Sequence, residues 1–392
     1  MVYRKYLILL AFIFYVSAAC AQQDSTAMAD STAEQLYHSG DWAQLIIFGK
    51  NAVAKGLDFP GLRFKLGYAY MLKGNYKAAL TEFDNVLAED GHNATARLFA
   101  YYCNTYLNNS LGASYHAKYL DKETLSSLKI SPFGLVDASA ETGIKLPNND
   151  QRDNGFFERI GLSNRLSWRL QLEQSALLFK QNILRGGFRD HFNQTGRTDR
   201  QWEYFLKTKF ALNSEWQLIG SYHYLHTSYR NNYYHSNLGL IGIKYNTRYF
   251  DLQGDWQFGK LINSTLKQYN AKVDFYPTGN LNLYSGSRVS LLNMDGKDRL
   301  VYNQTLGYKV IDKVWMESTV TFGNLDDYLD TDGLYVYNSI DPTTFKCGET
   351  VFYQLGGHAL LNLNYIYERK TDIYRSTKYN QNSITLGMIW KF

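Results

Sequence analysis

The segment 382–392 reads NSITLGMIWKF and ends on an aromatic residue. Successive side chains of a β-strand point to opposite faces. One face of such a strand would carry only apolar side chains: Ile384, Leu386, Met388, Trp390 and Phe392. The other face would carry Thr385, Gly387, Ile389 and Lys391. Because chain ends are usually polar and poorly ordered, this pattern predicts a strand whose apolar face meets an apolar environment.

The same alternation recurs throughout residues 128–392, for example in FDLQGDWQF at 250–258. The alternating runs are about ten residues long, whereas strands of soluble proteins average about 5–6. A tilted strand that crosses a bilayer needs about 9–11 residues. Every second residue can then contact lipid while its neighbours line a polar interior, and ring closure satisfies the backbone hydrogen bonds. The pattern predicts an antiparallel up-and-down transmembrane β-barrel.

The alternating segments indicate about 14 strands. Twelve or sixteen remain open, because strand boundaries are the weakest part of such a prediction. The expected strand starts are near residues 132, 155, 167, 200, 215, 233, 248, 265, 280, 299, 313, 346, 358 and 380. Residues 333–341 are interpreted as part of a long external hairpin, because one more strand would make the count odd. An even count places both ends of the barrel sequence in the periplasm, together with the preceding helices.

The connections between these segments alternate in length. Short ones include 213–215, 246–248 and 312–313, whereas longer ones include 184–199 and 326–345. Outer-membrane barrels show this pattern, with short periplasmic turns and long external loops.

The inward positions of the expected strands are rich in charge. Ten of them are candidate lumen-lining residues: Arg169, Glu173, Glu203, Lys207, Asp251, Asp255, Lys272, Asp274, Arg288 and Glu317. Two arrangements remain open for a barrel of this size. The charges could line a narrow or gated aqueous channel, or they could pair across neighbouring strands and fill the lumen. Because both signs are present, no strong ion selectivity is expected.

An enzymatic barrel is a minor alternative, as a lipase or acylase. Such a hydrolase needs a serine and a histidine within hydrogen-bond reach. Ser221 and His223 share the inward face, but same-face neighbours on one strand stand too far apart for that bond. His226 falls on the outward side or in a loop, so it cannot join His223 and His235 in a metal site. We expect no catalytic residues, no metal and no cofactor.

The composition excludes two other classes of protein. The 392 residues carry a net charge of +5, with Lys and Arg scattered rather than clustered, so nucleic acid is not an expected partner. After the N-terminal segment, no window approaches the roughly 18 apolar residues of a membrane helix. The mean hydropathy of −0.37 excludes a helical membrane bundle. It does not exclude a barrel, whose alternating residues average to a hydrophilic value.

Residues 1–21 have the features of a secretory signal peptide. Arg4 and Lys5 precede an apolar stretch, and Ala19-Cys20-Ala21 matches a small-residue cleavage site before Gln22. Lipidation of Cys20 is the alternative. Either way, the mature chain is expected to leave the cytoplasm.

Residues 22–127 are predicted to be helical with a period of 34 residues. Gly40 and Gly74 are one period apart, and the next period falls on Asn108. The middle copy resembles the tetratricopeptide repeat at Gly67, Tyr70, Gly74, Ala79 and Phe83. In such repeats, small residues let two helices approach closely and aromatic residues fill the space beside them. The resemblance implies a short solenoid whose groove binds a partner protein or peptide. A spacer that seats the next domain is the alternative.

The order of a signal peptide, these helices and a Tyr-rich barrel resembles outer-membrane barrel proteins of the Bacteroidota, including the YaiO-like group. It is more loosely similar to the porins that export cellulose and poly-N-acetylglucosamine. The last strand resembles the signal that the barrel-assembly machinery recognises, here Thr385, Gly387, Trp390 and Phe392. The resemblance implies outer-membrane lipid and the assembly machinery as partners, and passage of a polysaccharide. The solenoid is far shorter than in the export porins, and the inward positions show no aromatic track.

The sequence therefore predicts three parts: a signal peptide over 1–21, a periplasmic tetratricopeptide-like α-solenoid over 22–127, and an outer-membrane β-barrel over 128–392. The expected function is that of a narrow porin, or of a component that exports glycan or another solute, with helices that dock a periplasmic partner. The alternative is a structural barrel whose helices recruit a periplasmic envelope complex.

Overall fold

The structure is a computed structural model of the 392-residue chain, and it describes residues 25–183, 197–229, 232–262 and 264–392. The expected signal peptide and Cys20 lie outside the described residues, as does most of the expected loop 184–199. The chain divides after Asn108 into two compact units.

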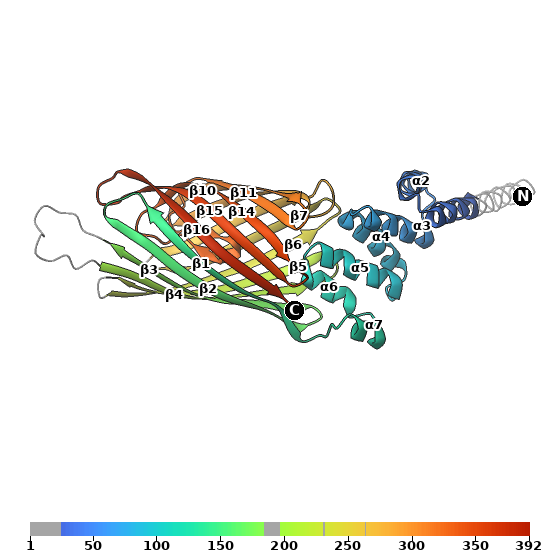
Figure 1. Cartoon of the computed structure of the whole chain (residues 1–392), viewed down its shortest axis with the longest axis horizontal. Coiled ribbons are helices and arrows are strands. Elements are labelled where there is room, and N and C mark those ends of the chain that lie inside the picture. The colour runs from blue at the N-terminus through green and yellow to red at the C-terminus, as the bar shows by residue number, and fades with distance from the viewer. Residues whose placement is uncertain (1–24, 184–196, 230–231, 263) are drawn as a thin grey trace, which may run out of the picture. The chain divides into compact units, whose positions relative to one another are not determined.

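The first unit consists of helices (Figure 1). Residues 25–39 are helical, and they are followed by α2 (Trp42–Ala54), α3 (Pro60–Leu72), α4 (Tyr76–Glu89) and α5 (Ala94–Tyr106). Three of these helices are preceded by a residue whose side-chain oxygen accepts a hydrogen bond from a backbone N–H of the first turn. These capping residues are Asp41, Asn75 and Asn93. Within the described residues, no helix combines the length and the apolar character that crossing a membrane requires.

The 34-residue period appears in the backbone of the turns. Gly40, Gly74 and Asn108 all adopt a left-handed conformation, with φ of 72°, 75° and 57°. Glycine adopts this conformation freely and asparagine tolerates it. Each is followed by the capping residue of the next helix: Asp41, Asn75 or Asn109. The predicted period therefore corresponds to a repeated turn between helices.

Helices α3 and α4 pack closely in the middle copy of the repeat. Gly67 lies against Phe83, and a Cβ added at Gly67 would stand 2.8 Å from the Phe83 ring. Tyr70 and Ala79 are buried in the same core. A glycine at position 67 thus lets the two helices approach, which is the packing that the sequence pattern implies.

The second unit contains, within the described residues, a closed barrel of 14 antiparallel strands. They are β1 (Gly134–Pro147), β2 (Arg152–Ser167), β3 (Leu170–Ile183), β4 (Arg197–Ala211), β5 (Trp216–Tyr229), β6 (Asn232–Asn246), β7 (Phe250–Leu261), β8 (Ser264–Phe275), β9 (Leu283–Met294), β10 (Lys297–Ile311), β11 (Val314–Phe322), β14 (Thr343–Leu355), β15 (Ala359–Thr371) and β16 (Lys378–Lys391). The ring closes where β1 runs beside β16, with Ala138 opposite Trp390 (Figure 1). Strands β12 (Leu329–Asp330) and β13 (Tyr335–Val336) form a separate two-stranded sheet, which we call the small hairpin.

The predicted strand count is confirmed, and each observed start lies within three residues of the expected one. The first and last barrel strands therefore bring Gly134 and Lys391 to one end of the barrel, which we call the near end; the opposite end is the far end. The expected alternation of loop lengths is only partly present. The far-end connection of β9 and β10 is a tight turn of Asp295 and Gly296, both with positive φ, whereas the near-end connection 276–282 is longer.

The two faces of the barrel wall differ in chemistry. The apolar side chains of the last segment point outward and remain 40–62 % exposed: Ile384, Leu386, Met388, Trp390 and Phe392. Ser383 and Thr385, on the other face of β16, line the interior. An exposed apolar outer face around a polar interior is the arrangement of a barrel surrounded by lipid.

Helices α6 (Ser110–Ala117) and α7 (Lys122–Ser127) belong to the same unit as the barrel. Tyr115 of α6 shares a buried apolar cluster with Ala211, at the near end of β4. The Arg169 guanidinium stands 5.3 Å from the centre of the Tyr115 ring. Helix α6 therefore packs against the near rim of the barrel.

Candidate functional site in the barrel lumen

The connection between β11 and β14 folds into the barrel. Residues 323–342, which we call the inserted loop, contain β12, β13 and the 3₁₀ turn η1 (Thr331–Gly333). Leu329 and Val336 pair across the small hairpin. The absence of a spanning strand at 333–341 agrees with the prediction. The prediction of an external hairpin is wrong, because the loop contacts the inner wall on several strands.

Apolar side chains of the inserted loop are buried against leucines of the inner wall. Leu329 packs in a cluster with Leu225, Leu238, Leu261 and Leu266. Leu325 and Tyr328 pack in a second cluster with Leu292 and Val301. Each of these side chains is at most 3 % exposed. Apolar burial contributes about 25 cal/mol per Å², so an apolar patch on a mostly polar wall stabilises the loop inside the barrel.

Asp332 fixes the tip of the inserted loop. Its carboxylate accepts hydrogen bonds from Lys207 Nζ at 2.6 Å and from Gln253 Nε2 at 2.7 Å. The Arg288 Nη2 atom lies 3.4 Å from the same carboxylate. These partners come from β4, β7 and β9, so one acidic side chain joins the loop to three strands.

Ser221 and His223 bind the backbone of the loop. Ser221 Oγ donates to the carbonyl oxygen of Asp332 at 2.9 Å. His223 Nδ1 lies 2.7 Å from the carbonyl oxygen of Gly333, and its Nε2 lies 3.0 Å from a carboxylate oxygen of Glu203. Both ring nitrogens of His223 therefore have partners other than a serine.

His226 and His235 lie on the outer face of the barrel. They are opposite each other on β5 and β6, and His235 Nδ1 lies 2.7 Å from the Tyr224 hydroxyl. His223 is on the inner face, so the three histidines do not converge. Within the described residues, no three His, Cys, Asp or Glu side chains are grouped so that they could hold a metal ion.

Asp330, at the end of β12, lies between two cations. Its carboxylate is 3.1 Å from Arg288 Nη1 and 3.5 Å from Lys346 Nζ. Buried charges require such partners, because an unpaired charge in a protein interior costs several kcal/mol. The charges of the inner wall therefore pair with the inserted loop as well as with neighbouring strands.

The returning limb of the loop crosses to another part of the wall. Arg152 of β2 donates two hydrogen bonds to the Asp341 carboxylate, at 2.7 and 2.8 Å. The Tyr379 hydroxyl of β16 donates to the same carboxylate at 2.8 Å. Asn338 donates to Gln201 of β4 at 2.7 Å. The inserted loop is thus fixed to strands on different sides of the lumen.

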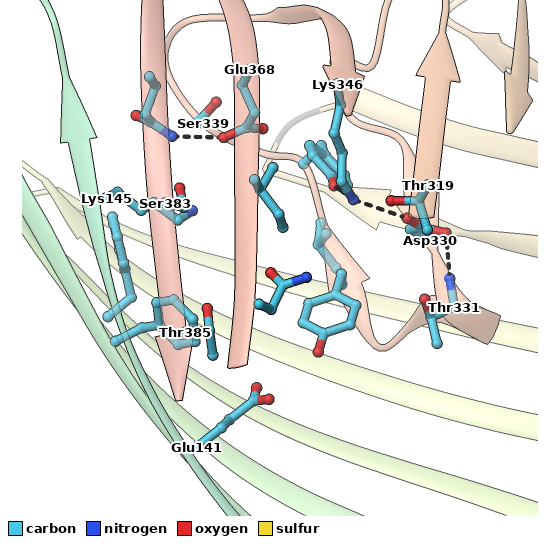
Figure 2. Close-up of a pocket in the computed structure, with 18 of the residues that line it drawn as sticks. Glu141, Lys145, Thr319, Asp330, Thr331, Ser339, Lys346, Glu368, Ser383 and Thr385 are labelled. Atoms are coloured by element: carbon cyan, nitrogen blue, oxygen red, sulfur yellow. Dashed lines mark hydrogen bonds and ion pairs between the residues drawn. The ribbon is translucent and has the colours of Figure 1, made fainter. Parts of the chain in front are cut away.

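A cavity of about 660 Å³ remains beside the inserted loop. Figure 2 shows Glu141, Lys145 and Thr385 on one side of it, and Asp330 and Lys346 on the other. Pockets that bind small molecules have volumes of about 300–1,000 Å³. The lumen is therefore partly filled by the loop, and the space that remains is of a size suited to a small solute.

Several solved outer-membrane proteins are similar to the barrel. The Pseudomonas putida toluene transporter TodX matches with a TM-score of 0.45 and 7% identity, over 67% of this chain and 89% of that chain. A Pseudomonas aeruginosa FadL homologue matches with a TM-score of 0.43 and 9% identity, over 73% and 97%. The KdgM porin, solved with disordered oligogalacturonate, matches with a TM-score of 0.32 and 8% identity, over 65% and 99%.

These likenesses concern the barrel architecture alone. No protein-family model matches the chain, and no curated protein is similar to it in sequence.

The ten candidate lumen residues occupy three settings. Five line the cavity: Glu203, Lys272, Asp274, Arg288 and Glu317. Four make side-chain contacts elsewhere inside the barrel: Glu173, Lys207, Asp251 and Asp255. Arg169 lies in the turn between β2 and β3, over the ring of Tyr115.

The four residues of the expected assembly signal lie on both faces of the closing segment. Trp390 and Phe392 are exposed on the outer face, and Thr385 lines the cavity. Gly387 faces inward, where an added Cβ would stand 2.6 Å from the Asn362 side chain. The close approach of Asn362 explains why glycine suits this position, independently of any assembly factor.

The sequence interpretation missed the acidic residues of the inserted loop. Asp330, Asp332 and Asp341 were assigned to an external hairpin, yet their carboxylates bind the wall. One signal could have indicated this. Inward leucines such as Leu225 and Leu266 would be unfavourable on a wall that faces water. They therefore indicate that a segment covers the wall at these positions.

Proposed function

We propose that the chain is a non-enzymatic outer-membrane β-barrel that passes a small solute through a narrow lumen. The observation that supports this most directly is the cavity of about 660 Å³ inside a closed ring with a polar inner face. The exposed apolar outer face, as on Leu386 and Trp390, suits a lipid environment. The polar wall would replace the water around a solute during passage.

The inserted loop would restrict this lumen. It is held on one side through Asp332 and on the other through Asp341. A loop fixed mainly by side-chain contacts can change position without breaking the ladder of the barrel. A low conductance that rises when the loop is released is therefore expected.

A plugged structural barrel is the second candidate, and the same loop favours it. The loop contacts strands on different sides of the lumen, as Lys207 and Arg152 show. In this case the barrel would anchor the helices, which would recruit an envelope complex. The permeability of the purified full-length protein separates the two candidates.

The helical unit is proposed to be a periplasmic tetratricopeptide-like solenoid that docks a protein or peptide. The repeated left-handed turn at Gly40, Gly74 and Asn108 supports this proposal, as does the contact of Gly67 with Phe83. By resemblance to Bacteroidota barrel proteins, we also propose recognition by the barrel-assembly machinery. A polysaccharide is the proposed solute by the same resemblance.

Planar-bilayer recording of the purified full-length protein tests the channel. Discrete conductance steps with weak ion selectivity are expected, because the lumen carries both signs of charge. A bilayer that stays sealed at all voltages, after insertion has been verified, would contradict the channel function and favour the structural barrel. The heat-denatured protein is the control for leakage.

Detergent dependence tests the membrane assignment separately. The chain without residues 1–21 is expected to aggregate when no detergent is present, because its outer face is apolar. A soluble and monodisperse protein under those conditions would contradict the assignment.

A further inference from the structure

Two phenylalanine rings form an apolar surface on the inner wall beside the cavity. Phe157 of β2 and Phe179 of β3 are opposite each other in the strand register, and both line the cavity. Phe157 is also opposite Gly143, where an added Cβ would stand 2.3 Å from its ring. A Cβ at Gly155 would stand 3.1 Å from the Phe179 ring. The two glycines therefore leave room for the rings to lie along the wall.

Polar side chains border these rings on both sides along the strands. Glu141 and Arg159, which are opposite each other, occupy the adjacent row on the near side. Lys145 and Ser383, also opposite each other, occupy the adjacent row on the far side. Same-face rows are two residues apart along a strand, which is about 6.7 Å. Polar side chains therefore lie one row, or about 6.7 Å, from the rings on either side.

Several polar atoms in these rows have no hydrogen-bond partner among the described residues. They are Nε and Nη1 of Arg159, Oε1 of Glu141 and Oγ of Ser383. Arg159 and Ser383 are only 7 % and 5 % exposed, and both line the cavity. Arg159 Nε and Glu141 Oε1 form an ion pair at 3.1 Å without hydrogen-bond alignment. A buried donor or acceptor without a partner is unfavourable, so Arg159 Nη1 and Ser383 Oγ favour a ligand that supplies hydroxyl groups.

The inserted loop contributes an aromatic residue to the opposite side of this site. The Arg159 guanidinium stands 4.5 Å from the centre of the Tyr335 ring, which also lines the cavity. Tyr335 belongs to β13, so the site lies between the wall of the barrel and the small hairpin. This arrangement gives the site the form of a slot.

We propose that this slot binds a neutral sugar ring. The ring slot comprises Phe157 as the stacking surface, with Glu141, Arg159 and Ser383 at its edges. Phe179 lies beside it, with the Lys145 ammonium 5.1 Å from the centre of the Phe179 ring. A pyranose has apolar C–H faces that stack on phenylalanine and hydroxyls around its edge that bond to the polar rows. A neutral ring fits the near edge of the slot, because Glu141 and Arg159 form an ion pair there. The inference rests on the proposed function, since the slot lies in the lumen through which the solute would pass.

Two other ligand types fit the slot less well. An aromatic hydrocarbon would cover Phe157 and Phe179 but leave the buried polar atoms of Arg159 and Ser383 without partners. An acyclic polyol would supply hydroxyls but has no rigid apolar face to stack. A sugar ring meets both demands at once.

Saturation-transfer NMR of the full-length protein in lauryldimethylamine oxide micelles tests the ring slot. This detergent has no sugar headgroup that could compete. The probes are cellobiose and N,N′-diacetylchitobiose, with mannitol and benzyl alcohol as the two partial mimics. We expect at least one disaccharide to bind and both mimics to bind at least tenfold more weakly. The same probes, added during planar-bilayer recording, are expected to reduce the current in proportion to their occupancy.

Substitutions locate the binding within the lumen. Phe157→Leu removes the stacking face and is expected to weaken disaccharide binding by about three- to tenfold. Ser383→Ala removes one edge hydroxyl and is expected to weaken it by about threefold. The matched control is Phe210→Leu on the outer face of β4, where Phe210 is exposed; its binding should be unchanged. Circular dichroism and heat-modifiable gel mobility verify that each variant is folded.

The outcomes distinguish the slot from the channel. A conducting protein that binds neither disaccharide retains the channel and overturns the slot, as does equal binding of mannitol or preferential binding of benzyl alcohol. Unchanged binding in folded Phe157→Leu and Ser383→Ala overturns the slot as well. Disaccharide binding that Phe157→Leu weakens, in a protein whose bilayer stays sealed, supports the slot and overturns the channel.

Discussion

Lys207 and Asp332 are 125 residues apart in sequence, and the Lys207 ammonium lies 2.6 Å from the Asp332 carboxylate. This contact joins the barrel wall to the tip of the inserted loop. Gln253 and Arg288 bind the same carboxylate. The position of the tip of the loop therefore depends on one acidic side chain that contacts three strands.

Asp332→Ala is expected to release the tip of the loop. Removing one partner of a buried ion pair costs about 3–5 kcal/mol. Here Lys207 would keep only Glu173, at 3.8 Å, and Arg288 would keep only Asp330. Lys207 and Arg288 would then face an empty position, and the loop would detach from this side of the lumen. The expected result is a larger single-channel conductance in planar bilayers, together with faster proteolysis within 323–342.

Removing the partner as well supplies the control for this prediction. The double variant Lys207→Met with Asp332→Leu replaces the pair by apolar side chains, which is often nearly neutral for stability. It should conduct less than Asp332→Ala. Equal conductance of wild type and Asp332→Ala would show that the loop does not restrict the pore.

Asp327 gives the inserted loop a dependence on pH. Burial, together with the neighbouring carboxylates of Asp326 and Asp295 and against the opposing charge of Arg299, raises the pKa of its carboxyl to about 7. The ordinary value is 3.8, so the folded loop favours the protonated form. The stabilising contribution is complete below that ordinary value and is lost as the pH rises through about 7.

We therefore expect the loop to be cleaved by added protease more slowly at about pH 5.5 than at about pH 8.5, after correction for the activity of the protease. Asp327→Asn, which is neutral at both values, should remove most of this difference. If the variant retains the full pH dependence, another group is responsible.

Gly67→Val is expected to destabilise the helical unit. The added Cβ would stand 2.8 Å from the Phe83 ring, and overpacking of a buried contact costs about 1–3 kcal/mol. The measurement is thermal unfolding followed by circular dichroism at 222 nm. Gly61→Val on the same helix is the matched control, since its Cβ would meet no atom closer than 3.6 Å. Equal melting temperatures for the two variants would argue against this packing role.

Phe392→Ser is expected to lower the amount of barrel in the outer membrane and to leave the helical unit folded. Phe392 is exposed on the outer face, and its backbone N–H donates to Val136 at 3.1 Å across the barrel seam. Heat-modifiable gel mobility of membrane fractions measures the assembled form. Tyr353→Ser, an outward aromatic elsewhere on the near half of the barrel, is the control. Normal levels of the Phe392 variant would contradict a role in assembly.

The barrel wall could be predicted from the sequence because a strand alternates with period two over its whole length. Each residue of 382–392 has the face that the alternation assigns to it, so the closing strand follows directly from the pattern. Such local periodicity needs no knowledge of distant residues. The strand starts agree within three residues for the same reason.

The arrangement inside the barrel could not be predicted from the same pattern. The contacts of Asp332 with Lys207 and of Asp341 with Arg152 join segments far apart in sequence, and no periodicity encodes them. Alternation identifies a charged residue such as Glu203 as inward, but not whether it faces the cavity or another side chain. Phe157 and Phe179 could not be recognised as a pair from the sequence, because each is a single inward aromatic residue on its strand. They become neighbours only through the register of β2 and β3.

The seam between β1 and β16 has a kinetic consequence. Ala138 and Trp390 are paired although they lie 252 residues apart in sequence, so this ladder can form only when the first and last barrel strands have been brought together. Until then both edge strands can pair with other chains. The chain has also lost conformational entropy by bringing distant segments together, before the hydrogen bonds of the last ladder compensate for that loss. A partly assembled sheet is therefore an aggregation-prone intermediate. The yield of folded barrel should therefore depend more on the rate at which β1 and β16 pair than on the stability of the closed ring.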